Sequence, residues 1–390
     1  MIEKEQVKIA FCENGKGFGG AAISLQTYLS ARSSWVKPLI ITGQAEGEYV
    51  CYKDFGTWET IVQPRNFNAL AKDLLGKPIG SMADNLFNIV PTALKFARLF
   101  VKHRIDLVYL NNDVYSNLAA ALGAYLVRKP VMLHLRGFCE ISPSSCWVVR
   151  HLRHLAYVSE AIKHNALEFG IPEQQMTWIP EGINTDYFAK GNANNIRHSL
   201  SINTENLVVT LVGGLVGWKG QDILITAAPA ILDRYPNTIF LLVGSAYGHF
   251  NTIENQLLEL IKELNLKNKV LMLGKRNDIA DILAISDVVV HASTLPEPLG
   301  RTVVEGMAAG KAVIAANEGG PLDVITHGMD GLLITPRDPQ GLAHTICELL
   351  DNFELRQQLG AEAIKSAQKY SVDNHVRCVE AAIIKALEAK

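Results

Sequence analysis

The sequence predicts an α/β protein of two doubly wound domains, each built on a parallel sheet. Short β-branched runs alternate with helical stretches along the 390 residues, which is typical of parallel strands joined by crossover helices. Most of these runs are continuously apolar, as expected for strands that are buried on both faces. The length also suffices for two domains with separate hydrophobic cores.

The predicted strands fall into two groups. Five lie in the first half, at residues 7–10, 39–42, 107–110, 131–135 and 155–158. Six lie in the second half, at residues 207–212, 239–243, 270–273, 288–292, 312–315 and 331–334. Residues 182–205 are polar, rich in turn formers and without an apolar period, so the predicted domains are 1–185 and 186–372. Residues 373–390 carry apolar side chains at a helical period and predict a final helix.

The least regular part of the first domain is the stretch 64–100. Single apolar residues are scattered among polar ones there, without the two-residue alternation of a strand. We expect either an additional pair of helices packed on the core, or an amphipathic edge that touches a membrane or a lipid.

Composition indicates a folded globular chain, because apolar residues make up 48% and charged residues 19%. No uninterrupted run of about 18 apolar residues occurs, so no transmembrane helix is predicted. The charged residues 1–6 lead directly into a strand, and we expect no signal peptide. None of the six cysteines forms a C-x-x-C pair, so we expect reduced thiols in a cytosolic protein and no zinc site.

The net charge of −2 predicts no general attraction to nucleic acid. The halves differ, because residues 1–190 hold 20 Lys and Arg against 17 Asp and Glu, and the remainder holds 17 against 22. Basic residues cluster at 95–104, 128–129 and 150–164. These clusters indicate either solvated helix faces or a surface that meets anionic lipid or a lipid-diphosphate acceptor.

The most informative segment is 297–305, which follows the strand at 288–292 and leads into a helix of small residues. Glu297 and Glu305 flank a Gly300-Arg301 step where the loop becomes a helix. The unpaired N–H groups and the positive dipole end of a helix N-terminus suit a phosphate. Glu297 can accept hydrogen bonds from sugar hydroxyls, and Glu305 from a ribose. The segment therefore predicts a site for a nucleotide sugar.

Residues 297–305 resemble the E-x-F-G-x-x-x-x-E signature of the family 4 retaining glycosyltransferases, which have the GT-B fold. Residues 319–333, 212–220 and 19–22 resemble further blocks of that family. The resemblance implies two Rossmann-like domains that face each other across a cleft, with the acceptor side in the first and the nucleotide sugar in the second. It also implies that the final helix crosses back to the first domain, and that the protein is of the bacterial surface-polysaccharide type.

The donor's diphosphate needs cationic partners, because its negative charge grows as the sugar leaves. Lys219 follows a strand and a Gly-rich turn, and resembles the family's phosphate-contacting lysine. The family's Gly-Arg-Leu step is Gly213-Gly214-Leu215 here, so one arginine is missing. Arg301 is the natural substitute, and an ion pair of Arg301 with one of the two glutamates is the alternative.

Glycines and main-chain groups complete the donor site that the resemblance implies. Gly19 and Gly20 lie in the loop after the first strand and are placed beside the donor phosphates, the alternative being a plain strand–helix turn. Leu299 replaces the family's phenylalanine, and N–H groups at 299–301 donate to the sugar or the phosphate. Main-chain groups at 274–277 meet the base.

His134 ends the strand at 131–135, and a polar side chain at the carboxyl end of a parallel strand faces the ligand crevice. The resemblance implies that His134 contacts the donor sugar and polarises the transition state, and the alternative is a buried histidine with satisfied hydrogen bonds. Arg136 is expected to bind a phosphate or an acidic acceptor group. Asn111 and Asn112 end another strand and are acceptor-side candidates.

The predicted site residues are as follows. The predicted catalytic residues are His134, Lys219, Glu297 and Arg301. The predicted donor-binding residues are Gly19, Gly20, Gly214, Lys219, Gly274, Lys275, Arg276, Glu297, Leu299, Gly300, Arg301, Thr302 and Glu305. The predicted acceptor-side residues are Asn111, Asn112 and Arg136, and no metal ligand is predicted. Glu181-Gly182 stands where the family often has Asn-Gly.

The resemblance predicts a retaining hexosyltransferase that moves a sugar, glucose by default, from a UDP-sugar to a saccharide or lipid-linked saccharide. The chain has no D-x-D triplet, so we expect a metal-free reaction without a cofactor. The resemblance implies front-face attack without a covalent nucleophile. We expect a cytoplasmic protein at the inner face of the membrane, with peripheral contact through its basic N-terminal domain and no nucleic-acid partner. The alternatives are a sugar-nucleotide epimerase on the same fold and a silent nucleotide-sugar-binding module.

Overall fold

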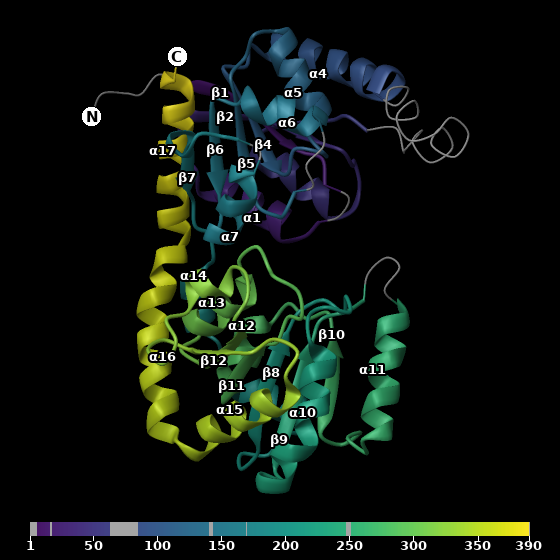
Figure 1. The fold of residues 1–390 in the computed structure, drawn as a ribbon, viewed down its shortest axis with the longest axis vertical. Helices are drawn as coiled ribbons and strands as arrows, with labels where there is room; N and C mark the ends of the chain where they lie inside the picture. The colour runs from purple at the N-terminus through teal and green to yellow at the C-terminus, as the bar shows by residue number, and fades with distance from the viewer. Residues whose placement is uncertain are drawn as a thin grey trace. The chain divides into compact units, whose positions relative to one another are not determined.

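The structure, a computed structural model, describes residues 6–15, 18–62, 85–139, 143–168, 170–246 and 251–389. Two compact units make up the chain (Figure 1). Unit 1 comprises Met1–Gly182 with Val372–Lys390, and unit 2 comprises Ile183–Ser371. The boundaries predicted from the sequence are 185/186 and 372/373.

Unit 1 contains a seven-stranded parallel sheet in the order β3-β2-β1-β4-β5-β6-β7. The strands are β1 (Val7–Glu13), β2 (Val36–Thr42), β3 (Thr57–Thr60), β4 (Leu107–Asn112), β5 (Val131–Leu135), β6 (His154–Tyr157) and β7 (Met176–Trp178). The five strands predicted in this half are confirmed. The edge strands β3 and β7 were missed, because they are only four and three residues long and none of their residues is buried.

Helices cover both faces of this sheet. The helical elements are α1 (Gly20–Ala31), η1 (Gly47–Phe55), η2 (Asn85–Ile89), α4 (Val90–His103), α5 (Leu118–Leu126), α6 (Pro143–Arg150), α7 (Glu160–Leu167), η3 (Glu173–Gln175) and α17 (Val372–Glu388). One core contains Phe96, Leu133 and Val148, beneath α4, α5 and α6. The other contains Met132 and Ile383, beneath α1 and α17. Successive residues of β5 thus face opposite cores, as in a doubly wound sheet.

The irregular stretch 64–100 is only partly described. Its second half forms α4, which buries Thr92, Phe96 and Phe100 against the core. Residues 64–84, where the first helix of the expected pair would fall, lie outside the described residues.

The predicted C-terminal helix is present as α17 and packs with unit 1. It buries Val379, Ala382 and Ile383 beside α1. Its Glu380 carboxylate accepts hydrogen bonds from the Ser33 N–H (2.8 Å), the Ser33 hydroxyl (2.8 Å) and the Trp35 indole N–H (3.1 Å). Apolar burial and these polar contacts together tie the end of the chain to its beginning.

Unit 2 contains a six-stranded parallel sheet in the order β10-β9-β8-β11-β12-β13. The strands are β8 (Leu207–Val212), β9 (Thr238–Val243), β10 (Val270–Gly274), β11 (Val288–His291), β12 (Ala312–Ala316) and β13 (Leu332–Ile334), so all six predictions are confirmed. The helices are α8 (Thr185–Ala189), α9 (Ala193–Ser199), α10 (Gln221–Arg234), α11 (Asn251–Glu263), α12 (Ile279–Ile285), α13 (Arg301–Ala308), α14 (Pro321–Val324), α15 (Pro339–Asp351), α16 (Phe353–Ala367) and η4 (Gln368–Tyr370).

The turn-rich stretch 182–205 holds the short helices α8 and α9, which the sequence analysis did not predict. The Asn184 side chain caps α8 by accepting a hydrogen bond from the Tyr187 N–H at 3.0 Å. Ile196 of α9 is buried against the apolar cluster that contains Val208 and Ile282. Local capping and a single apolar anchor therefore suffice for helices too short to show a period.

The loop between β8 and α10 approaches β11 through a glycine. Gly220 has a φ of +75°, and an added Cβ would lie 1.9 Å from the carbonyl oxygen of Ala292. A side chain there would meet both a left-handed backbone and a rigid carbonyl. Gly220 therefore brings the Lys219 loop against the end of β11.

We expect Gly220→Ala to destabilise the protein far more than Gly328→Ala. Gly328 shares a positive φ (+78°) but has no atom within 4 Å of an added Cβ, so its substitution costs only about 1–2 kcal/mol of backbone strain. At Gly220 overlap adds to that strain, for a total of roughly 3 kcal/mol or more. Midpoints of thermal unfolding measure both variants, and equal shifts would contradict the close approach.

Candidate functional site

In unit 2 the predicted donor residues lie where parallel strands end. Lys219 is in the loop after β8, Glu297 is in the loop after β11, and Gly274 is the last residue of β10. Carboxyl ends of parallel strands share one edge of a sheet, which is where ligands bind in open α/β sheets. The fold therefore brings Lys219 and Glu297, 78 residues apart in sequence, to one edge.

Three side chains converge on one oxygen of Glu297. The Lys219 ammonium lies 2.8 Å from Oε1, and His291 Nε2 lies 2.7 Å from the same atom. The Ser293 hydroxyl donates to it as well. Burial alone would raise the pKa of Glu297, but the adjacent His291 and Lys219 outweigh burial and hold the pKa well below its usual range. Glu297 is therefore an ionised carboxylate that is only 6% exposed.

The Gly319-Gly320 step fixes the Glu297 loop from the other side. Gly319 pairs with Glu297 as an isolated parallel bridge, and the Gly320 N–H donates to the Glu297 carbonyl at 2.8 Å. An added Cβ would lie 2.6 Å from the Glu297 carbonyl oxygen at Gly319 and 2.3 Å from the Leu299 Cα at Gly320. Both glycines are thus required for backbone to pack directly on the loop.

Helix α13 begins directly after that loop. Gly300 caps it with a φ of +85°, and no side chain caps its N-terminus. Arg301 and Thr302 form the first turn, and Leu299 is buried before it. Burial raises the pKa of Glu305, although the positive charges of Arg301 and Lys219 oppose the shift. The pKa values of the two glutamates, eight residues apart in sequence, are thus shifted in opposite directions.

Some of the other donor-side residues are held by side-chain contacts, and others are exposed to solvent. Gln221 holds the Gly213–Gly214 turn, because its amide donates to both carbonyl oxygens, at 3.2 and 3.1 Å. The Lys219 ammonium also lies 4.4 Å from the centre of the Trp218 ring. Gly274 has a φ of +63° and Lys275 is exposed. Arg276 forms a two-point ion pair with Asp278.

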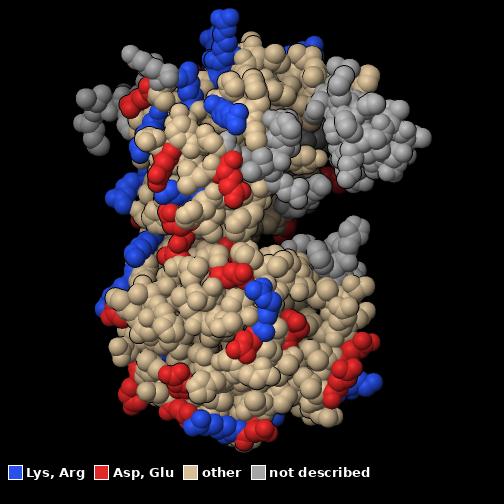
Figure 2. All heavy atoms as spheres, in the orientation of Figure 1, with Lys and Arg blue, Asp and Glu red and all other residues tan. Residues whose placement is uncertain are grey.

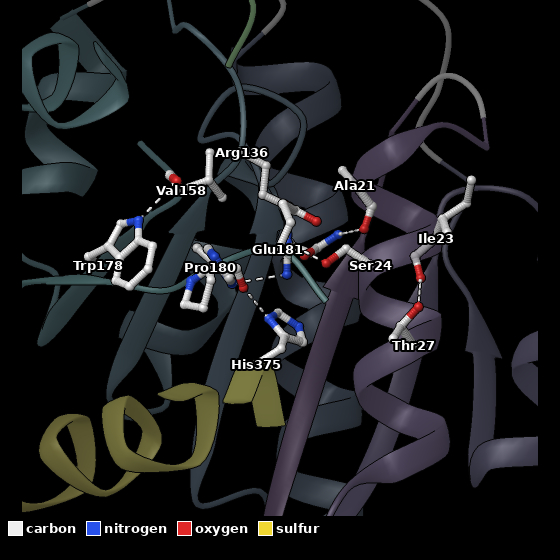
Figure 3. A network of polar contacts seen from close by, with 12 residues as sticks. Ala21, Ile23, Ser24, Thr27, Arg136, Val158, Trp178, Pro180, Glu181 and His375 are labelled. Atoms are coloured by element: carbon white, nitrogen blue, oxygen red, sulfur yellow. Dashed lines mark hydrogen bonds and ion pairs between the residues drawn. The ribbon is translucent and has the colours of Figure 1, made fainter. Parts of the chain in front are cut away.

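In unit 1, Arg136 is the centre of a buried polar network (Figure 3). Its Nε donates to Asn111 Oδ1 at 2.8 Å, and Nη1 donates to the Ser24 hydroxyl at 2.7 Å and to the Glu181 carboxylate at 2.5 Å. The side chains of Arg136 and Glu181 are only 2% and 5% exposed. Such a pair is held in place by its extra hydrogen bonds, since desolvation opposes it.

The same network fixes the protonation of His134. Arg136 Nη2 lies 3.0 Å from His134 Nδ1, which the Tyr109 hydroxyl also contacts. Since a guanidinium only donates, Nδ1 must accept, and the ring proton is on Nε2. Burial, Arg136 and His375 hold the pKa of His134 well below its usual range. Within the described residues, Nε2 has no hydrogen-bond partner.

Other predicted unit 1 residues show more local contacts. The Asn111 amide donates to the Glu13 carboxylate and to the Ala21 carbonyl. Asn112 has a left-handed backbone (φ +79°) and donates to Asp113 at 3.1 Å. Gly19 precedes α1, of which Gly20 is the first residue, and an added Cβ at Gly19 would meet no atom within 4 Å. Close packing in the described chain therefore does not explain the glycine at 19.

Sequence reasoning missed several members of these networks. Glu13 is the last residue of β1, and His291 is the last residue of β11. Both carry the signal that singled out His134, a polar side chain at the carboxyl end of a parallel strand. Glu181 and Ser293 follow strands in loops. Glu181 was noted as a departure from the family's Asn-Gly but was given no role, and no local signal distinguished Ser293 from ordinary polar residues.

Parts of this chain resemble known proteins. Residues 192–366 match the family model "Glycosyl transferases group 1". An uncharacterized glycosyltransferase (MJ1607) of Methanocaldococcus jannaschii is 30% identical over 225 residues, or 56% of each chain. A D-inositol 3-phosphate glycosyltransferase of Corynebacterium diphtheriae is 30% identical over 200 residues, which cover 50% of this chain and 46% of that one. These matches support a glycosyltransferase of group 1.

Solved structures support the same assignment. Anabaena Alr3699/HepE in complex with UDP is 26% identical, with a TM-score of 0.81 over 97% of this chain and 100% of that one. Another structure of that protein contains UDP-glucose. The predicted fold class, two Rossmann-like parallel-sheet domains of the GT-B type, is confirmed. The chain spans about half the length of the first curated relatives it matches.

We expect Glu297→Gln to destabilise the protein and Glu305→Gln to leave it at least as stable as the wild type. The lowered pKa of Glu297 means that its charge stabilises the fold above about pH 4.5 and that this contribution is lost as the pH falls further. The raised pKa of Glu305 means that its charge costs stability at neutral pH, and that this cost fades on acidification. At pH 7 we expect a loss of about 1–3 kcal/mol for Glu297→Gln and none for Glu305→Gln.

Urea unfolding from neutral to acid pH measures this contrast. The variant lacking Glu297 should lose less stability on acidification than the wild type, because it lacks the titrating group. Parallel pH profiles for both variants and the wild type would contradict the two assignments.

We expect the imidazole of His134 to remain neutral, with its proton on Nε2, through the pH range in which free histidine titrates. The reason is that Arg136 and Tyr109 occupy Nδ1 inside a buried site. Long-range ¹H–¹⁵N spectra report the tautomer, and His134→Gln identifies the signal among the 11 histidines. A ring that titrates near its usual pKa of about 6.5 would contradict the network.

Proposed function

We propose that this chain is a retaining glycosyltransferase that moves a hexose, glucose by default, from a UDP-sugar to a saccharide or lipid-linked saccharide. The observation that carries the proposal is the buried Glu297 carboxylate, paired with Lys219 and His291 at the carboxyl edge of the unit 2 sheet. It lies in the region that matches the family model. The UDP and UDP-glucose complexes of Alr3699/HepE support the choice of nucleotide.

Lys219 and Glu297 are suited to exchange partners when a donor binds. The side chain of Lys219 is 21% exposed, and its ammonium pairs with Glu297. A diphosphate offers it a partner of higher charge, and the carboxylate then remains held by His291 and Ser293 while its outer face accepts sugar hydroxyls. Arg301 and the uncapped N-terminus of α13 add positive potential for the leaving diphosphate.

Retention is proposed to follow front-face attack through an oxocarbenium-like state, without a covalent enzyme intermediate. Glu297 acts as a fixed acceptor for the sugar, and Glu305 as an acceptor for the ribose, so they are not the paired acid and nucleophile of a glycoside hydrolase. We propose that no metal is required. The chain would serve polysaccharide biosynthesis in the cytoplasm.

We expect Lys219→Ala to weaken UDP binding roughly 10- to 100-fold, since a charge-assisted hydrogen bond contributes about 1.5–3 kcal/mol. Calorimetry in the presence of a chelator measures the affinity. Lys262→Ala is the matched control, because Lys262 is an exposed lysine of α11 in the same unit. Unchanged affinity in the Lys219 variant would remove this residue from the phosphate site, and loss of binding on chelation would contradict the metal-free donor site.

A thermal-shift screen of UDP-, GDP- and ADP-sugars without metal tests the function itself, because a ligand of the folded state raises the melting temperature. A shift with one UDP-sugar, followed by its consumption only when a saccharide acceptor is present, is the expected outcome. Conversion of the donor without acceptor would show an epimerase instead. No shift with any sugar nucleotide would favour a silent module.

A further inference from the structure

Three neighbouring helix-to-strand connections line the amino edge of the unit 1 sheet. Helices α4, α5 and α6 precede β4, β5 and β6, which are adjacent in the sheet and parallel. Main-chain hydrogen bonds join each connection to the start of a neighbouring strand, from Val108 N of β4 to Pro130 O (3.0 Å) and from Arg153 N to Val131 O of β5 (2.9 Å). The last turns of the three helices therefore form one continuous rim, opposite the carboxyl edge that holds His134.

This rim is strongly basic. None of α4, α5 and α6 contains Asp or Glu. Arg104 and Arg128 are exposed just past the ends of α4 and α5, and Arg150 is exposed at the end of α6. Lys and Arg side chains stand out at the uppermost edge of unit 1 in Figure 2. The negative end of a helix dipole stabilises a cation at the helix C-terminus, which accounts for the position of these arginines. It does not account for the exposed apolar side chains beside them.

Each basic residue has an exposed apolar neighbour in the last turns of its helix. Val101 is 61% exposed, Leu126 is 61% exposed and Trp147 is 47% exposed. The Trp147 ring stacks on His151 at 4.4 Å and meets the edge of Tyr125 at 5.4 Å, so its orientation is fixed. A tryptophan between cations and aliphatic side chains is typical of surfaces at the headgroup level of a bilayer.

Two acidic residues near the rim differ in their partners, because Glu59 contacts basic side chains whereas Asp106 contacts a neutral main-chain N–H. Glu59 lies 3.3 Å from the Lys102 ammonium and 3.4 Å from His103 Nε2, and Asp106 accepts a hydrogen bond from the Lys8 N–H at 2.8 Å. Within the described ranges, Arg104 and Arg128 form no ion pair. They are therefore available to an external anion.

We propose that the amino-edge rim, formed by Val101, Arg104, Leu126, Arg128, Trp147 and Arg150, docks this protein on an anionic phospholipid bilayer. Cations attract the lipid phosphates, and the apolar side chains enter the boundary between headgroups and acyl chains. A nucleic acid or an acidic protein would use the cations but leave the apolar side chains without a role. No helix in the described part of the chain is long and apolar enough to cross a bilayer. The inference goes beyond the proposed transferase activity and does not depend on it.

Vesicle sedimentation of the full chain, without sugar nucleotide, tests the proposal. We expect binding to vesicles rich in phosphatidylglycerol, little binding to phosphatidylcholine, and weaker binding as salt rises. Arg104→Glu/Arg128→Glu should weaken binding by about 25-fold or more, because each cation near an anionic surface contributes about fivefold. The matched control is Lys262→Glu/Lys267→Glu, which makes the same charge change on exposed residues of unit 2.

Fluorescence quenching by lipids with brominated acyl chains tests whether Trp147 enters the bilayer. The chain has five tryptophans, and Trp147→Phe should remove the quenching that anionic vesicles cause in the wild type while retaining the charges. The melting temperature verifies that each variant is folded. UDP affinity, measured separately, tests the donor site, so failure of the transferase proposal is distinguished from failure of membrane docking. Three results would each overturn the proposal: equal binding to both lipids, equal loss in the control variant, or charge-dependent binding without quenching of Trp147.

Discussion

Strands buried on both faces leave a parallel sheet only its edges for polar chemistry, and both units follow this constraint. Most side chains in the Glu297 and Arg136 networks belong to a strand end, to a loop after a strand, or to a helix that begins after such a loop. Tyr109 of a strand interior and His375 of α17 are exceptions. The carboxyl edge is also where helix N-termini point, so positive potential and polar side chains are concentrated together. The geometry of the candidate site is in this sense a consequence of the fold rather than an addition to it.

The two units bury charge in different ways. The Arg136 guanidinium is enclosed, because it donates one hydrogen bond to each of four residues, Glu181, Asn111, Ser24 and His134. Lys219 has one carboxylate partner, and its ammonium remains partly exposed. Because breaking an enclosed pair leaves an uncompensated buried charge, Arg136 is fixed in place, whereas Lys219 is free to exchange one anion for another. A fixed cation organises its neighbours, and an exchangeable one binds ligands.

Much of the fold could be predicted from the sequence, because parallel strands that are buried on both faces consist of continuous apolar runs. Strands such as β8 and β5 match their predicted bounds. The edge strands β3 and β7 lack that signal, since one or both of their faces are open to solvent. Glu297 and Lys219 were predicted as site residues from resemblance and position, and the structure pairs them. The convergence of His291 and Ser293 on the same carboxylate oxygen was not predicted, because it depends on how the loop after β11 folds back against the end of its own strand.

At two positions the sequence departs from the family pattern, and both departures change the balance of charge. Where the family has Gly-Arg-Leu, Gly214 leaves the turn after β8 without that arginine, and the Gln221 amide fastens the turn by donating to the carbonyl oxygens of Gly213 and Gly214. Where the family often has asparagine, Glu181 adds a negative charge that is matched by Arg136. The first change removes a positive charge from unit 2, and the second commits a positive charge in unit 1 to an internal partner. Within unit 2, the first change increases the share of phosphate binding that the proposed function assigns to Lys219, Arg301 and the N-terminus of α13.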